Sequence, residues 1–106
     1  RDFCLSRGLG DVYKRQTFIN VGSGKVIDVY GGKSVNGQNV AQYTSNNSLA
    51  QKWIAKKNSD GSLTFVSALD KNYVLDISGG LIQNRQNVQL YQNNGTNAQK
   101  FKLTKI

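Results

Sequence analysis

The chain has 106 residues, a length that allows one domain with a modest core and argues against a multistep enzyme. With 11 Gly, no Pro and no apolar run of the roughly 18 to 20 residues that cross a bilayer, we expect a turn-rich fold and no membrane partner. The formal charge is +8, but the lysines are spread singly apart from Lys56 and Lys57, so we expect a solvated surface rather than a nucleic-acid partner.

Residues 1–16, RDFCLSRGLGDVYKRQ, show neither the alternation of a strand nor the periodicity of a helix. They contain the only cysteine, Cys4, which cannot form an intrachain disulfide. The run SRGLGDVYKRQ resembles translated sequencing-adapter read-through, so we predict a non-native leader; a native basic arm is the alternative. Because the chain begins at Arg1 with no visible signal peptide, we expect a fragment or a processed form.

The rest of the chain contains one unit twice, at an offset of 48 residues. Residues 26–53 align without a gap on residues 74–101, and 13 of the 28 positions are identical. Each copy holds three runs of strand type, VIDV or VLDI, NVAQY or NVQLY, and QKWIA or QKFKL, separated by Gly- and Asn-rich turns at roughly ten-residue spacing. This rhythm predicts an all-β barrel or sandwich, with the Gly-Gly pairs at 31–32 and 79–80 in turns that need positive φ.

Alternation along the predicted strands gathers polar side chains on one side. Successive side chains of a strand point to opposite faces, so Asp76 points away from its aliphatic neighbours, and Gln89 and Tyr91 point away from Leu90. In the Gln-x-aromatic run we expect the aromatic residue, Trp53 in the first copy, to fill the core. Its Gln is expected to fix a turn or to face the site.

This order of an aliphatic-Asp-aliphatic strand, a Gly-Gly turn, an N-V-x-x-Tyr run and an A-Q-K-[WF] run resembles the repeat of the ricin-B-type lectins. The resemblance covers residues 17–106 and implies a β-trefoil, in which three four-stranded units form a pseudo-threefold barrel with a shallow sugar pocket available in each. About two of the three units are present, at about 17–60 and 61–106. We therefore expect the intact protein to carry a third unit upstream.

The resemblance also implies the residues that bind the sugar. A neutral sugar offers hydroxyls and an apolar C–H face, so its pocket needs a fixed carboxylate, amides and an aromatic surface. In the second unit Asp76 would accept hydrogen bonds from vicinal hydroxyls, and Tyr91 would stack on the sugar face. Gln89 and Gln99 would bind hydroxyls or buttress the site. The matching residues of the first unit are Asp28, Tyr43 and Gln51.

Two departures separate these units from the family pattern and from each other. Ala41 stands where the second unit has Gln89, which makes the first pocket the weaker candidate. The residue three positions before the core aromatic is alanine in both units, Ala50 and Ala98, where ricin-type sites often carry a sugar-contacting Asn. Galactose preference is therefore not implied. The neighbouring Asn97 either substitutes for that Asn or serves a turn.

The inventory of side chains argues against catalysis. Outside residues 1–16 the chain has no His, Glu or Cys, and its acids are four aspartates. Asp28 and Asp76 occupy equivalent positions of separate units, so they should not form the close carboxylate pair of a glycosidase. No His or Cys cluster suggests a metal. We predict that the chain is not an enzyme and needs no cofactor or metal.

The predicted function is therefore carbohydrate binding to an oligosaccharide or polysaccharide, through weak pockets that gain affinity by engaging one polymer together. Modules resembling this one are commonly attached to secreted glycoside hydrolases. The resemblance thus implies an extracellular bacterial protein that holds a covalently linked catalytic domain on its substrate. The alternatives are a trefoil that binds proteins or polyanions through its basic surface, and a scaffold without a ligand.

Overall fold

The computed structural model describes residues 15–80 and 86–102, together with the backbone of residues 3–5. Within these residues the chain is all-β, with four short 3₁₀ helices and no α-helix. No helix in this part of the chain is long and apolar enough to cross a membrane. The strands are β1 (Phe3–Leu5), β2 (Arg15–Gln16), β3 (Phe18–Asn20), β4 (Val26–Val29), β5 (Gln38–Tyr43), β6 (Trp53–Lys57), β7 (Leu63–Ser67), β8 (Tyr73–Ile77) and β9 (Val88–Gln92). The 3₁₀ helices are η1 (Tyr30–Gly32), η2 (Leu49–Gln51), η3 (Ser78–Gly80) and η4 (Asn97–Gln99).

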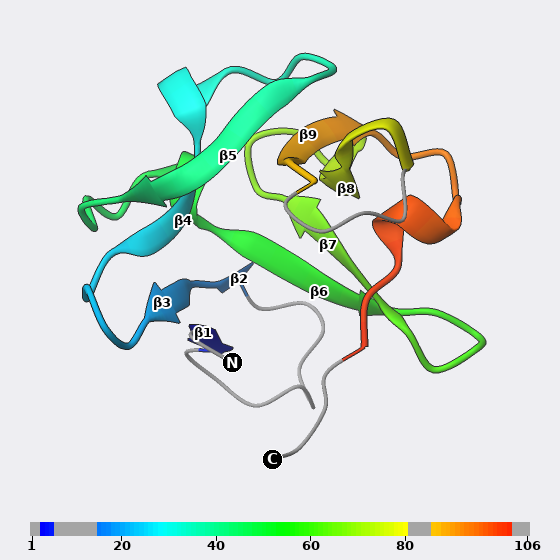
Figure 1. Cartoon of the computed structure of the whole chain (residues 1–106), viewed down its shortest axis with the longest axis horizontal. Coiled ribbons are helices and arrows are strands. Elements are labelled where there is room, and N and C mark those ends of the chain that lie inside the picture. Colours follow the sequence, from blue (N-terminus) through cyan, green and yellow to red (C-terminus); the bar gives the residue numbers. More distant parts are fainter. Residues whose placement is uncertain (1–2, 6–14, 81–85, 103–106) are drawn as a thin grey trace.

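The nine strands form one antiparallel sheet in the order β1-β3-β4-β5-β9-β8-β7-β6-β2, which curls around the core (Figure 1). Most neighbours in this order are consecutive in the chain, because short turns suffice to join antiparallel strands. Strands β5 and β9 are not consecutive in the chain, and their pairing joins the two hairpins of the repeat. In it Gln38 lies opposite Leu90 and Asn39 opposite Gln89. The N–H of Gly37 extends this ladder by donating to the carbonyl of Leu90 at 2.8 Å.

The repeat predicted from the sequence is a repeat of structure. In the β4–β5 hairpin Asp28 lies opposite Ala41, and in the β8–β9 hairpin Asp76 lies opposite Gln89, the same register 48 residues later. Figure 1 shows the two hairpins next to each other; β6 follows the first hairpin in the chain, and β7 precedes the second. The two copies therefore place equivalent positions at the same points of their hairpins.

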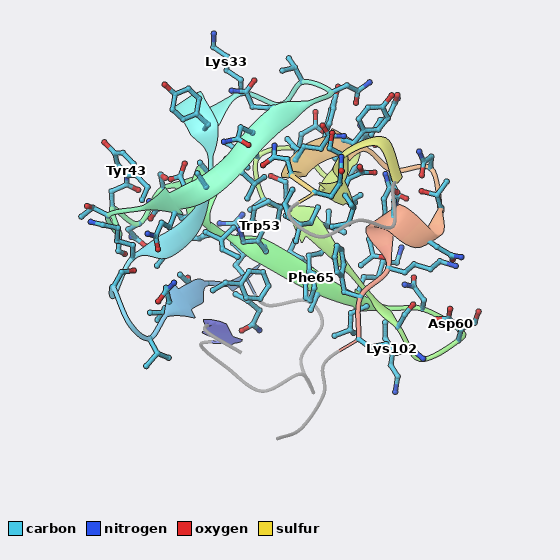
Figure 2. All side chains as sticks on the ribbon, viewed as in Figure 1. Lys33, Tyr43, Trp53, Asp60, Phe65 and Lys102 are labelled. Carbon is cyan, nitrogen blue, oxygen red and sulfur yellow. The ribbon has the colours of Figure 1, made fainter. Side chains whose placement is uncertain are left out.

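The core is built by the side chains that alternate with the polar ones. Trp53, Val29 and Leu90 are fully buried, and the rings of Phe65 and Phe101 pack with their centroids 5.8 Å apart. Figure 2 shows Trp53 and Phe65 in the interior of the molecule. Burial of a large apolar side chain stabilises a fold by roughly 1.5–3 kcal/mol. The prediction that the aromatic residue of the Gln-x-aromatic run fills the core is confirmed for Trp53, while Phe101 is half-buried against the core.

Two parts of the predicted leader, residues 1–16, belong to this sheet. The backbone of β1 pairs antiparallel with β3, and β2 pairs with β6 through Arg15 opposite Ile54 and Gln16 opposite Trp53. The side chain of Gln16 is buried. Residues 1–2 and 6–14 lie outside the described residues, and the non-native origin of the segment stays a prediction.

Candidate functional site

Each unit carries an open pocket between its hairpin and the two 3₁₀ helices that follow the strands of that hairpin. We call them the first-unit pocket, of about 560 Å³, and the second-unit pocket, of about 420 Å³. Both volumes lie in the range of small-ligand sites. The first-unit pocket is lined by Asp28, Tyr30, Gly31, Gly32, Tyr43, Asn46, Ser48, Leu49, Ala50 and Leu69. The second-unit pocket is lined by Asp76, Gly79, Gly80, Gln89, Tyr91, Asn94, Thr96, Asn97 and Ala98.

The carboxylate of the second-unit pocket is held by two glutamines. Gln99 Nε2 donates to Asp76 Oδ2 at 2.9 Å, and Gln89 Nε2 donates to Asp76 Oδ1 at 3.2 Å. Asp76 is only 5% exposed, so these amide donors compensate for the water that a buried carboxylate loses. Each carboxylate oxygen retains a lone pair that can accept a further hydrogen bond.

Gln99 also closes the turn beneath the pocket. Its second amide hydrogen is donated to the carbonyl of Gln92 at 2.9 Å, and its Oε1 accepts from the N–H of Asn94 at 2.9 Å. Gln99 is 1% exposed and is not among the lining residues. Its place is therefore behind Asp76, where it fixes the turn and orients the carboxylate.

The first unit repeats this arrangement. Gln51 Nε2 donates to Asp28 Oδ2 at 2.9 Å and to the carbonyl of Thr44 at 2.9 Å, while its Oε1 accepts from the N–H of Asn46 at 2.9 Å. Gln51 is 1% exposed. Of the two roles that the sequence left open for this Gln, the structure shows the turn-fixing one in both units.

The tyrosines stand at the outer wall of each pocket. Tyr91 lies opposite Val74 on the β8–β9 hairpin and is half-buried, whereas Tyr43, opposite Val26, is 59% exposed. Figure 2 shows Tyr43 at the periphery of the molecule, near one end of β5. A phenol ring in this position offers an apolar face to a ligand that enters from solvent.

The two pockets differ where the sequence indicated. Gln89 lies in the pocket wall and donates a hydrogen bond to Asp76, but the equivalent Ala41 has no side-chain donor for Asp28. Both alanines that replace the family's Asn line their pockets, and Asn97 lies beside Ala98 in the wall of the second-unit pocket.

A second pair of glutamines holds the Gly-Gly turns that form the other wall. Gln86 Nε2 donates to the carbonyl of Ser78 at 2.6 Å, and Gln38 makes the equivalent bond to the carbonyl of Tyr30. The glycines of both turns have φ between 61° and 69°, which confirms the prediction of positive φ. An L side chain disfavours this conformation, so glycine at these positions keeps the wall thin and the turn unstrained.

Several lining residues were not predicted from the sequence to belong to the site. Asn46, Ser48 and their counterparts Asn94 and Thr96 lie in the walls, because the turn before η2 or η4 folds over the pocket. Their equivalent position in the two copies is a signal for a turn, and the same turn also forms the pocket wall. Leu69 carries no such signal, because it reaches the first-unit pocket from the β7–β8 turn of the following unit.

The chemistry available in each pocket is that of recognition. A carboxylate, a phenol ring, amides and hydroxyls can bind a neutral polyol, whose hydroxyls donate and accept hydrogen bonds and whose C–H groups pack on a ring. No group of three or more His, Cys, Asp or Glu that could hold a metal ion occurs among the described residues.

The sequence matches the model of the ricin-type beta-trefoil lectin domain-like family over residues 9–91, and the chain belongs to this family. Membership supports carbohydrate binding in general, in a family that is generally non-catalytic. The resemblance seen in the repeat and the predicted β-trefoil fold are both confirmed.

Three solved structures show the same fold. A designed threefold-symmetric protein, ThreeFoil, is 26% identical with a TM-score of 0.87, over 98% of this chain and 71% of that one. An exo-beta-1,3-galactanase from Clostridium thermocellum is 24% identical with a TM-score of 0.87, over 98% of this chain and 22% of that one. A mosquitocidal holotoxin is 19% identical with a TM-score of 0.79, over 92% of this chain and 12% of that one. A comparison with curated protein sequences gives no match.

Proposed function

We propose that this chain is a non-catalytic carbohydrate-binding module whose two pockets each bind one sugar residue of an oligosaccharide or polysaccharide. The observation that carries the proposal is the repeated pair of a carboxylate and a buried glutamine, Asp28 with Gln51 and Asp76 with Gln99, joined by the same 2.9 Å bond in both units. A carboxylate fixed in this way loses little conformational freedom when it accepts hydrogen bonds from the hydroxyls of a ligand.

The roles of the individual side chains follow from their positions. Asp76 accepts from two neighbouring hydroxyls through its free lone pairs, and Tyr91 packs on the C–H face of the sugar ring. Gln89 keeps one amide oxygen that can accept from a further hydroxyl. In the first unit Asp28 and Tyr43 take the corresponding roles.

The proposal includes a place in a larger protein. Two shallow pockets on one rigid sheet engage one polymer with a higher combined affinity than either has alone. As the family resemblance implies, such a module anchors a covalently linked, secreted bacterial glycoside hydrolase to its polysaccharide. That arrangement is a proposal about the whole protein and rests on the sugar binding of this part.

The test is retention on immobilised xylan, arabinogalactan, β-glucan and chitin. We expect retention on at least one of them, and a loss of about ten-fold or more in affinity for the Asp28→Asn, Asp76→Asn double variant, since a hydrogen bond to a charged group contributes about 1.5–3 kcal/mol. Asn leaves one oxygen to accept from the buried glutamine, so the turns should persist. The control is Asp60→Asn, which makes the same substitution once, at an exposed residue of the β6–β7 turn outside both pockets.

Two results would contradict this function. One is the absence of retention on every polysaccharide and on a glycan array; the other is unchanged retention of the double variant. The salt dependence of retention distinguishes sugar binding from polyanion binding through the basic surface. Counterion-driven binding weakens steeply between about 50 and about 200 mM salt, whereas the affinity of a neutral-sugar pocket barely changes.

A further inference from the structure

The exposed apolar side chains of the described residues are concentrated at one of the two pockets. The large hydrophobic residues that are most exposed are Val21, Tyr30, Val35, Tyr43 and Leu49. Three of these five line the first-unit pocket: Tyr30 at 67%, Tyr43 at 59% and Leu49 at 42% exposure. Apolar surface gathered around a pocket marks a site for a ligand with an apolar part.

The repeat provides an internal comparison for this apolar surface. Tyr30 begins η1 where Ser78 begins η3, and Leu49 begins η2 where Asn97 begins η4. In each unit the two 3₁₀ helices contact each other, so the same pair of elements borders both pockets and different side chains begin these elements. Leu69, half-buried in the β7–β8 turn, adds a further apolar group to the first-unit pocket.

Polar side chains, in contrast, are more numerous at the second-unit pocket. Asp76 carries the additional bond from Gln89, and Asn97 contributes an amide to the same wall. The first-unit pocket has Ala41 in place of Gln89 on its hairpin, and it is larger, about 560 Å³ against about 420 Å³. The first-unit pocket can therefore hold a bulkier and less polar group next to its carboxylate.

We infer that the two pockets select different sugar residues, and that the first-unit pocket binds one carrying a methyl-terminated substituent, placed against Tyr30 and Leu49. The second-unit pocket binds a residue whose substituents are all hydroxyls. This inference rests on the proposed sugar binding and adds its selectivity. Burial of one methyl group strengthens binding about four-fold, and a hydroxyl forced against Leu49 loses its water without a partner, which widens the difference.

The test uses sugars that differ only by the substituent. Two comparisons test the methyl of an acetamido group: N-acetylglucosamine with glucose, and N-acetylgalactosamine with galactose. A third, 6-deoxygalactose with galactose, tests a methyl attached directly to the sugar ring. Each sugar is titrated into the ¹⁵N-labelled protein. The amide signals of Gly31 and Gly32 report the first-unit pocket, and those of Gly79 and Gly80 report the second-unit pocket.

We expect at least one methyl-bearing sugar to bind the first-unit pocket about four-fold or more tightly than its parent, with no such preference at the second-unit pocket. The reciprocal variants Leu49→Asn and Asn97→Leu should remove the preference from the first pocket and create it in the second. Both residues are exposed, so a thermal unfolding midpoint close to that of the wild type is expected for each.

The outcomes separate this inference from the proposed function. Equal ratios at both pockets, binding at the second-unit pocket alone, or a preference that survives Leu49→Asn would overturn the selectivity and leave sugar binding in place. The absence of any response at either pair of glycines, together with no retention on the polysaccharides, would overturn both.

Discussion

Gln99 donates its side-chain amide to Asp76 Oδ2 over 2.9 Å while remaining 1% exposed, so a polar side chain at the bottom of a pocket is as buried as the core. The same relationship joins Gln51 to Asp28 in the other copy. A buried amide is stable only when its donors and acceptor are satisfied, and each of these glutamines makes three hydrogen bonds. The glutamine of the Gln-x-aromatic run is therefore a structural centre of its unit.

Replacement of Gln99 by alanine tests this role. The variant leaves the N–H of Asn94 and the carbonyl of Gln92 without their partner and removes a donor from Asp76. We expect Gln99→Ala to lower the free energy of unfolding by about 2–4 kcal/mol, given about 1–3 kcal/mol for each buried group left unsatisfied and partial access of water. Urea denaturation with linear extrapolation measures it.

The control for this prediction is Gln92→Ala. Gln92 is exposed and contributes its backbone N–H and carbonyl to the surrounding bonds, so its truncation should change stability by less than about 0.5 kcal/mol. If Gln99→Ala were as stable as this control, the glutamine would not be the structural centre described above.

Trp53 offers a second test, because its ring is fully buried while its indole Nε1 has no hydrogen-bond partner among the described residues. Phe101 occupies the equivalent position of the second unit. Trp53→Phe removes a donor that costs free energy to bury but leaves a small cavity, so the two effects should offset to within about 1 kcal/mol. Trp53→Ala should cost about 3–5 kcal/mol.

The measurement must avoid tryptophan fluorescence, since Trp53 is the only tryptophan. Circular dichroism during urea unfolding serves both variants. Equal losses of stability in Trp53→Phe and Trp53→Ala would mean that packing of the indole, rather than apolar volume, decides the stability of this core.

Alternation and repetition are what made the hairpins and their polar faces predictable. Because Asp76 and Gln89 lie on opposite faces from their core neighbours Leu75 and Leu90, their convergence follows from the period of a strand, and the register then places them directly opposite each other. The fully buried positions of Trp53 and Leu90 follow from the same pattern.

Features that depend on three-dimensional hydrogen bonding were not predictable in the same way. The sequence left two possible roles open for Gln51 and Gln99, fixing a turn or facing the pocket. What decides between them is the hydrogen bonds to backbone groups five and seven residues away, and the sequence pattern does not show where those groups point. Leu69 belongs to the turn of the neighbouring unit, and no spacing within one copy indicates that it lines the pocket of another.

The β6–β7 hairpin carries the last prediction, which concerns pH. Figure 2 shows Asp60 at the outer tip of this hairpin, and its Oδ1 accepts from the hydroxyl of Ser62 at 2.6 Å and from the N–H of Ser62 at 2.9 Å. The hydroxyl bond, followed by the backbone bond, lowers the pKa of the Asp60 carboxyl below its ordinary value, and the charge of Lys100 adds a smaller effect in the same direction.

A folded-state pKa below that of the unfolded chain means that the contribution of Asp60 to stability is present above the ordinary carboxyl pKa and is lost as pH falls through the lowered one. Ser62→Ala removes the larger cause, so the pKa of Asp60 should rise, and by more than in Lys100→Ala. The hairpin should persist, because Asn58 Nδ2 still donates to Thr64 Oγ1 at 2.9 Å. Titration of the Asp60 carboxyl carbon by ¹³C NMR measures both variants. A larger rise in Lys100→Ala would assign the shift to charge instead of to the Ser62 hydroxyl.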